Sequence, residues 1–158
     1  MIACEQQLEL SRFKVGVPSS QINSQSKGAL DSKKANVSIT VNLLPYEILD
    51  RQATSYGDIS LTLSNSSEKE IEVEVIRLEI VAASAGRVLM SSTPQVLNLP
   101  AKISLRSGET RTVEYRLQSA SKLYQKGQDA FARIRYRHTD QSERVIQSNP
   151  EAVAFMIP

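Results

Sequence analysis

Few residues in this chain could carry out chemistry. His138 is the single histidine among 158 residues, and Thr139 and Asp140 follow it. A histidine-based metal site would need at least two carboxylate companions, and a Ser-His-Asp arrangement would have one base, at a strand end. The sequence has no phosphate-binding or Rossmann glycine pattern and no HExxH or CxxC spacing. We therefore expect no catalytic residue, no cofactor and no metal, and we interpret the His138 segment as a solvated turn.

Two sets of charged residues alternate with apolar ones. The acidic set is Glu70, Glu72 and Glu74, and the basic set is Arg133, Arg135 and Arg137. Residues two apart in a strand point the same way, so each set lies on one face. If the two strands pair antiparallel, the sets form a salt-bridge ladder that sets the register, at about 0.2 to 1 kcal/mol per pair.

The alternative is a basic patch for an anionic partner, such as lipid head groups, nucleic acid or an acidic protein. Its candidate residues are Arg133, Arg135, Arg137, Arg116 and Arg144, with Phe131 among them. The chain carries a formal net charge of +2, which implies no polyanion-binding arm. We therefore expect no nucleic-acid partner.

Three tyrosines mark a candidate binding tip. Tyr46 and Tyr56 are expected in a loop between two strands, beside Pro45 and Gly57, and sandwich domains gather recognition in their end loops. Together with Tyr124 they could bind a glycan or a small ligand. The plainer alternative is that these tyrosines cap the core. The absence of Trp disfavours a platform of stacked indoles.

Cys4 is the single cysteine, so an internal disulfide or a cysteine-based zinc site is excluded. The run Met1–Cys4 resembles the end of a bacterial lipobox, and polar residues follow it. An acylated Cys4 would attach the protein to a membrane of the cell envelope. An ordinary free thiol would leave a cytoplasmic location as the alternative. No run approaches the roughly 18 to 20 apolar residues that span a bilayer.

Alternation of apolar and polar residues at period two predicts strands along most of the chain. A strand over 8–17 ends at Pro18, and the polar stretch 19–36 predicts a flexible loop or linker. From Val37 onward about seven strands follow at the spacing of a sandwich. We therefore expect two parts, an N-terminal strand with its polar segment (1–36) and a β-sandwich domain (37–158).

Three local sequence signals predict where these strands end, turn or bend. Pro45 predicts that the strand beginning at Val37 breaks after about Leu43. The turn residues Asn65 to Glu68 predict a hairpin. In the strand that follows, the apolar phase shifts at Ile76, which indicates a bulge or a strand that passes between sheets.

The runs DISLTLSNSSEKEIEVEVIRLEIV, SLRSGETRTVEYRLQ and DAFARIRYR resemble strands of immunoglobulin-like or fibronectin-like modules of bacterial extracytoplasmic proteins. The resemblance covers about 37–157 and lacks the cysteine pair and core Trp of antibody domains. It implies an all-β, antiparallel immunoglobulin-like β-sandwich of about seven strands with an extra N-terminal strand. It also implies an adhesive, scaffolding or carrier role, and it assigns no functional residue.

From these observations we expect a non-catalytic protein-interaction or assembly module, whose partner is another protein or a larger complex. The alternative is a binding module for a glycan or small ligand that uses the end loops of the sandwich. In a third possibility, the segment 1–17 adds a strand to the sheet of a neighbour.

Overall fold

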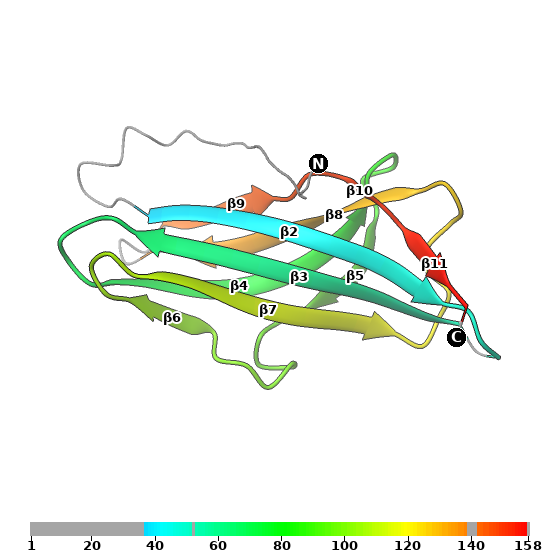
Figure 1. Ribbon diagram of the computed structural model, residues 1–158, viewed down its shortest axis with the longest axis horizontal. Coiled ribbons are helices and arrows are strands. Elements are labelled where there is room, and N and C mark those ends of the chain that lie inside the picture. The colour runs from blue at the N-terminus through cyan, green and yellow to red at the C-terminus, as the bar shows by residue number, and fades with distance from the viewer. Residues whose placement is uncertain (1–36, 52, 139–141, 158) are drawn as a thin grey trace.

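The computed structural model describes residues 37–51, 53–138 and 142–157, and these fold into two facing β-sheets (Figure 1). The first sheet has the strand order β11-β2-β3-β7. Its strands are β2 (Val37–Ile48), β3 (Thr54–Asn65), β7 (Thr110–Ser119) and β11 (Ala154–Met156). All its pairs are antiparallel except the parallel pair of β11 with β2.

The second sheet is antiparallel and is built around the pair of β4 and β8. The strands β5 and β6 lie along different parts of β4, and β9 and β10 lie along β8. The strands of this sheet are β4 (Ile71–Ala82), β5 (Val88–Ser92), β6 (Lys102–Leu105), β8 (Asp129–Arg137), β9 (Glu143–Gln147) and β10 (Glu151–Ala152). The predicted fold class, an all-β antiparallel sandwich, is confirmed.

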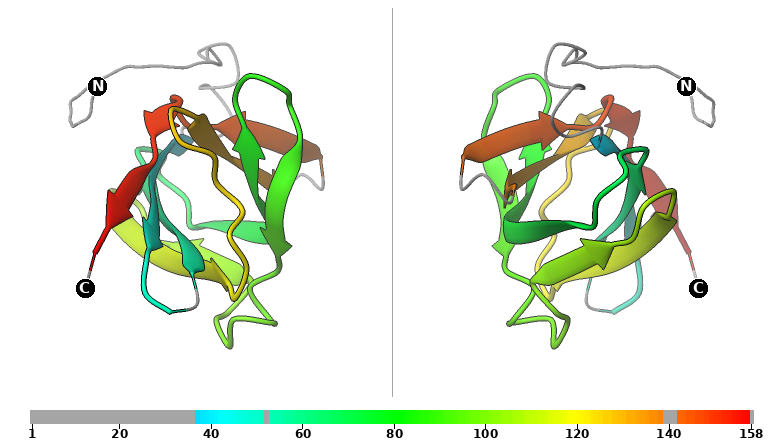
Figure 2. Two further views of the ribbon diagram at one scale, coloured as in Figure 1. Left: turned by 90° about the vertical axis from the view of Figure 1, so that its right-hand side faces the viewer. Right: turned by 90° about the vertical axis from the view of Figure 1, so that its left-hand side faces the viewer.

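The core lies between the two sheets, which Figure 2 shows end-on as two layers. Every second residue of β3 is buried, and Ile59, Leu61 and Leu63 are almost inaccessible to solvent. From the second sheet, Leu78 and Ile134 join the same apolar cluster. This alternation follows from the strand period of two, because one face of each sheet packs on the other sheet.

The connection between β3 and β4 corrects the predicted hairpin, because these strands belong to different sheets. The turn residues act as predicted, since the Asn65 side-chain oxygen accepts a hydrogen bond from the Ser67 backbone N–H at 2.9 Å. The chain crosses between the sheets again from β6 to β7, where Gly108 adopts a positive φ of 78°. Both crossings lie at the same end of the sandwich and are joined by hydrogen bonds, among them Gly108 N–H to the Asn65 carbonyl at 2.7 Å.

The predicted irregularity in β4 is confirmed as a bulge. The register with β8 shifts between Val75 and Arg77, which leaves Ile76 as the extra residue. Before the bulge Val75 faces the core, and after it Leu78 does. The bulge therefore keeps both halves of a long strand facing the core.

β2 runs through Pro45 to Ile48, which corrects the predicted break near Leu43. Proline has no N–H, so it fits a strand where its nitrogen faces an unpaired edge. Leu49, four residues later, donates its N–H to the Met156 carbonyl on the β11 side. Backbone groups alternate in direction along a strand, so Pro45 also faces that side and interrupts no bond to β3.

The N-terminal strand and polar segment predicted for 1–36 lie outside the described residues. Within the described part of the chain, no helix is long and apolar enough to cross a membrane.

Candidate interaction surface

The predicted basic residues of β8 share the outer face of the second sheet, and each is paired with an acid. Arg133 contacts Glu79 at 2.8 Å and Arg137 contacts Glu74 at 3.1 Å. Arg135 lies 3.8 Å from Glu143 on the neighbouring strand β9. The charges on this face are therefore largely neutralised within the sheet.

The ladder forms with a different set of acids than predicted. Of the predicted acidic residues, Glu74 lies opposite Arg137, whereas Glu72 lies opposite Ser104 on β6 and Glu70 precedes β4. β8 ends at Arg137, opposite Glu74, so it does not extend to Glu72, and the bulge at Ile76 displaces the rest of the register. Arg135 consequently lies opposite Arg77 rather than opposite an acid.

The two other predicted patch residues lie elsewhere. Arg116 is on β7 in the first sheet, where its guanidinium holds the Asp58 carboxylate through two hydrogen bonds of 2.8 and 3.2 Å. Arg144 lies opposite the buried Tyr136, so its side chain starts on the other face of β8 from Arg135. The five arginines do not form one patch.

His138 is buried rather than solvated, which corrects the interpretation of its segment. Its ring lies against Tyr136, with centroids 5.5 Å apart, and its backbone N–H donates to the Ser142 carbonyl. It packs where β8 turns back into β9. Thr139 and Asp140 lie outside the described residues, and within those residues no group of three or more metal-ligating side chains comes together.

Two of the predicted binding tyrosines lie in strands rather than in a loop. Tyr46 on β2 and Tyr56 on β3 are register partners, and their rings stack with centroids 5.0 Å apart and an interplanar angle of 14°. The Arg116 guanidinium lies over the Tyr56 ring, 5.8 Å from its centroid. Burial and the nearby Asp58 carboxylate raise the pKa of Tyr46. Tyr46 and Tyr56 therefore cover one face of each other's rings, and Arg116 lies over Tyr56.

Tyr124 belongs to the same end of the sandwich, and it caps the core. It is buried, and its hydroxyl donates to the Tyr56 carbonyl at 2.7 Å. Burial raises its pKa, and the nearby Glu47 carboxylate adds to that shift. Tyr124 therefore has the capping geometry, whereas Tyr46 and Tyr56 stack on the outer face of the first sheet beside Arg116. Their role in binding stays a prediction.

Sequence reasoning did not identify Glu47, which is fully buried beside these tyrosines. Its Oε1 lies 3.1 Å from the Ser55 hydroxyl, and its Oε2 has no hydrogen-bond partner among the described residues. The Ser55 hydroxyl has one proton, and its shorter contact, 2.8 Å, is with the Ser121 carbonyl. The Tyr115 hydroxyl is a second buried atom without a partner, and burial raises the pKa of Tyr115 to about 12.

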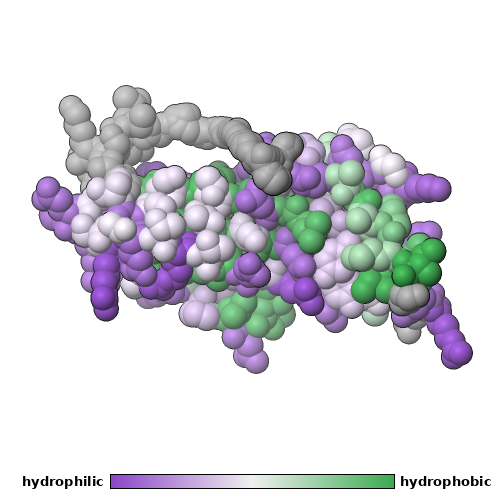
Figure 3. Space-filling model, in the orientation of Figure 1, coloured by the Kyte–Doolittle hydropathy of each residue, from purple (hydrophilic) through white to green (hydrophobic). Residues whose placement is uncertain are grey.

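The outer face of the first sheet differs from that of the second sheet because hydroxyl groups cover one half of it. Register places serine and threonine side chains in two rows across β2, β3 and β7. These residues are Ser38, Ser64 and Thr110 in one row and Thr40, Thr62 and Thr112 in the next. Hydroxyls of β3 and β7 pair at 3.0 and 2.8 Å. In Figure 3 this half is pale, and hydrophobic side chains gather at the other end near β11.

One edge of β2 lies beside these rows. Of the described strands, β11 alone pairs with this edge, and it does so from Tyr46 to Ile48. By the alternation that places Leu49 and Pro45 on the β11 side, the backbone groups of Val37, Ile39, Val41 and Leu43 point out of the sheet. The edge from Val37 to Pro45 contains no charged residue.

The other edge of the same sheet is β7, and it carries Arg111, Glu114 and Arg116. Charged side chains on an edge strand oppose pairing with other chains, and an uncharged edge rich in β-branched residues favours it. The edge of β2 from Val37 to Pro45, named the β2 edge below, is therefore the candidate interaction surface.

Comparison with known proteins gives no family. No family model and no curated protein matches the chain. A Northeast Structural Genomics Consortium target is similar with a TM-score of 0.44 and 10% identity, over 78% of this chain and 89% of that chain. Bacteroides uniformis beta-glucuronidase 2 gives a TM-score of 0.47 and 13% identity, over 70% of this chain and 12% of the enzyme.

A Bordetella pertussis protein with the provisional name ApaA gives a TM-score of 0.43 and 11% identity, over 74% of this chain and 94% of that chain. Similarities this low carry no argument about function.

Proposed function

We propose that this chain is a non-catalytic, immunoglobulin-like interaction module that binds a partner protein by accepting an added strand along the β2 edge. The observation that carries this proposal is the edge from Val37 to Pro45, which is uncharged and pairs with no described strand. In such binding, main-chain hydrogen bonds supply affinity, and side-chain contacts on alternate residues supply specificity.

The two outer faces support the edge as the binding surface. On the second sheet, the arginines already pair with Glu74, Glu79 and Glu143. A partner that recognised them would have to replace these ion pairs. The stacked rings of Tyr46 and Tyr56 leave little open aromatic surface for a sugar. The β2 edge offers backbone donors and acceptors that no described strand uses.

Site-specific photo-crosslinking in the native host tests the proposal. A photoreactive amino acid replaces the exposed Asn42 on β2, and a matched variant carries it at the exposed Thr112 on the β7 edge. We expect a discrete adduct with a second polypeptide from position 42 and none from position 112. The adduct should disappear with Ile39→Pro, which removes an N–H from the β2 edge, and persist with Ile39→Val.

Equal adducts from both positions, or an adduct that survives Ile39→Pro, would contradict binding at this edge. Circular dichroism and thermal unfolding of the Ile39→Pro protein control for loss of the fold, because Ile39 is partly buried against the core.

We further propose that the module works in a bacterial cell envelope, with Cys4 as a lipid attachment site. Its support is the sequence Met1–Cys4, since Cys4 lies outside the described residues. The intact mass of the protein from membrane and soluble fractions of its host tests this location. A membrane-bound chain that begins at an acylated Cys4 is the expected result, and an unmodified soluble chain would contradict it.

A further inference from the structure

Two arginines face each other on the outer face of the second sheet. Arg77 on β4 is the register partner of Arg135 on β8, and both side chains are exposed. Like charges directly opposite each other on neighbouring strands destabilise a sheet. The fold therefore carries a local cost at this position, and an anion between the two guanidinium groups would offset it.

The bulge in β4 creates this opposition of charges. With a regular register, Arg77 would lie opposite the buried Ile134 and would point toward the core. The bulge at Ile76 instead places Arg77 on the outer face, opposite Arg135. Bulges re-aim side chains in this way and are common next to functional sites.

The rows of side chains on either side of this pair are electrically balanced. Register places Gln147, Arg133, Glu79 and Ser91 in one row, and Glu143, Arg137, Glu74 and Lys102 in the other. The row between them holds Val145, Arg135 and Arg77. Two arginines and no acid give this middle row a formal charge of +2, whereas acids and bases are equal in number in each neighbouring row.

The contacts of the two guanidinium groups leave donors for a ligand. Arg77 Nη1 donates to the Ser91 hydroxyl, a neutral group, at 2.7 Å. Arg135 Nε lies 3.8 Å from Glu143 Oε1, and Glu143 also contacts Arg137, at 3.5 Å. A guanidinium has five N–H donors, so each of the two groups can hold an oxyanion while it keeps the contact that it has.

The charge and shape of the pair indicate the class of ligand. Guanidinium groups bind phosphate oxygens through pairs of parallel hydrogen bonds. A phosphate monoester carries about two negative charges at neutral pH, which matches the charge of the row, whereas a carboxylate or a phosphodiester carries one. Val145 lies on the far side of Arg135 and is 52% exposed, so it offers a contact for the organic part of an ester.

We propose that Arg77 and Arg135 form a binding site for a phosphate group, either free phosphate or a phosphate monoester. Of the five arginines that the sequence suggested for an anionic partner, this site uses Arg135 alone, and Arg77 was not among them. The site lies on the opposite sheet from β2, so the proposal does not rest on strand addition at the β2 edge.

Isothermal titration calorimetry with inorganic phosphate tests the site, with sodium chloride holding the ionic strength constant. We expect saturable binding of one phosphate per chain. Binding should weaken by roughly tenfold or more in Arg77→Gln and in Arg135→Gln, because each variant removes one of the two guanidinium groups. The matched variant Arg111→Gln, which loses an exposed arginine of the first sheet, should bind phosphate as the native chain does.

Two esters identify the source of the phosphate group. Phenyl phosphate should bind more tightly than inorganic phosphate where the ester packs on Val145, and Val145→Ser should remove that gain. Equal binding of the two compounds would assign the site to free phosphate. Dimethyl phosphate, a diester with a single charge, should bind roughly tenfold more weakly than inorganic phosphate because it leaves half of the charge of the row unmatched.

Thermal unfolding separates this site from the general stabilisation that phosphate gives through exclusion from protein surfaces. Phosphate at ten times its dissociation constant should raise the unfolding temperature of the native chain by roughly 3 °C more than that of Arg77→Gln. Without phosphate, Arg77→Gln should unfold at a higher temperature than the native chain, because the like-charge contact is gone.

Three results would overturn the proposal. They are the absence of saturable phosphate binding, equal binding by the native chain and Arg77→Gln, and binding of dimethyl phosphate as tight as that of phosphate. Circular dichroism of the two glutamine variants shows whether the fold is retained, which the exposure of both side chains leads us to expect.

Discussion

The two ends of β3 hold buried polar side chains in opposite ways. At one end, the Asn65 side-chain nitrogen lies 2.8, 3.0 and 3.1 Å from the carbonyls of Lys69, Leu105 and Arg106. Its oxygen accepts hydrogen bonds from Ser67. At the other end, Glu47 of β2 lies opposite Ser55, and one of its oxygens has no partner.

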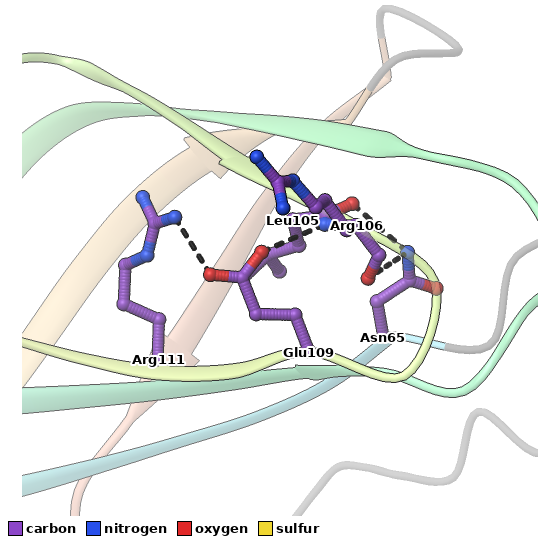
Figure 4. A network of polar contacts seen from close by, with 5 residues as sticks. All are labelled: Asn65, Leu105, Arg106, Glu109 and Arg111. Atoms are coloured by element: carbon purple, nitrogen blue, oxygen red, sulfur yellow. Dashed lines mark hydrogen bonds and ion pairs between the residues drawn. The ribbon is translucent and has the colours of Figure 1, made fainter.

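The difference indicates which end of β3 contributes more to the stability of the fold. A buried polar group that is fully hydrogen-bonded holds its surroundings in one arrangement, whereas one that is left unpaired costs free energy. Figure 4 shows Asn65 bonded to Leu105 and Arg106, with Glu109 linking Arg106 to Arg111. At the Asn65 end, hydrogen bonds join the two sheets. At the Glu47 end, a buried carboxylate oxygen has no partner among the described residues.

The sharpest test of this contrast is Asn65→Ala. It removes the donor to the buried Leu105 carbonyl and the acceptor of the Ser67 turn. We expect a loss of about 1 to 3 kcal/mol, because the variant removes the buried amide's hydrogen bonds to the second sheet together with those to the turn. Urea unfolding measures the change, and Asn42→Ala, at an exposed asparagine on β2, should change stability by less than about 0.5 kcal/mol. Equal losses would contradict a structural role for Asn65.

Packing at the Glu47 end gives the next largest effect, through Gly57→Ala. Gly57 lies opposite Pro45, and a Cβ added to it would overlap the Ile80 side chain from the other sheet. Overpacking of this kind costs about 1 to 3 kcal/mol. Thermal unfolding should show the loss, and Ser60→Ala on the outer face of the same strand serves as the control. A stable Gly57→Ala protein would mean that Ile80 shifts without strain.

The contrast between the ends predicts that Glu47→Gln stabilises the fold, whereas Asn65→Ala destabilises it. Glutamine keeps the shape of the side chain and replaces a carboxylate by a neutral amide where Oε2 has no hydrogen-bond partner among the described residues. A neutral amide costs less to bury than a carboxylate, so we expect the free energy of unfolding to rise by roughly 1 kcal/mol. Urea unfolding near neutral pH is the measurement. A marked loss would show that the carboxylate has a partner that glutamine cannot satisfy.

A smaller effect is expected for Arg116→Ala on the outer face above Glu47. The Arg116 side chain is 62% exposed, and it binds Asp58 and lies over Tyr56. Exposed ion pairs contribute about 0.2 to 1 kcal/mol and weaken with salt. We expect a loss in this range that shrinks in high salt, and Arg116→Lys should recover part of it. A loss independent of salt would assign the effect to packing on Tyr56 alone.

The sequence signals that succeeded were those that depend on one buried face. The alternation in β3, β4 and β8 and the phase shift at Ile76 predicted the strands and the bulge, since burial itself imposes the period of two. Predictions from residue type were wrong where contacts between distant segments determine the backbone conformation. Pro45 and Gly57 are turn residues by propensity, yet Pro45 stands at an edge that no described strand pairs with at that position, and Gly57 faces Ile80.

Other features of the structure cannot be predicted from residues that are neighbours in the sequence. The turn at Asn65 has the same chemistry whether the next strand pairs in the same sheet or in the opposite one. The arginines of β8 were predicted on one face, but their acidic partners follow from the bulge in β4 and from the end of β8 opposite Glu74. Glu47 resembles any charged residue near a strand end, so its burial emerges only when β3, Tyr124 and the Ser121 segment are assembled around it.

The weakest expected effect lies in the pH dependence of the Asn65 end. A hydrogen bond from the Arg106 N–H, followed by one from Arg111, lowers the pKa of Glu109 from its ordinary value of 4.5. A group whose pKa is lower in the folded state stabilises the fold above its unfolded pKa, and this contribution is lost as pH falls through the folded pKa. The stability difference between the native chain and Glu109→Gln should therefore be present near neutral pH and vanish in acid.

Urea midpoints of the two proteins across this range measure that difference. Arg111→Ala should remove less of the pH dependence than Glu109→Gln does, because the backbone N–H of Arg106 is the larger cause of the shift and remains in that variant. If Arg111→Ala removed all of it, the ion pair rather than the turn would hold the carboxylate. The hydrogen-bond network that stabilises the Asn65 end would then not include the bond from Arg106 to Glu109.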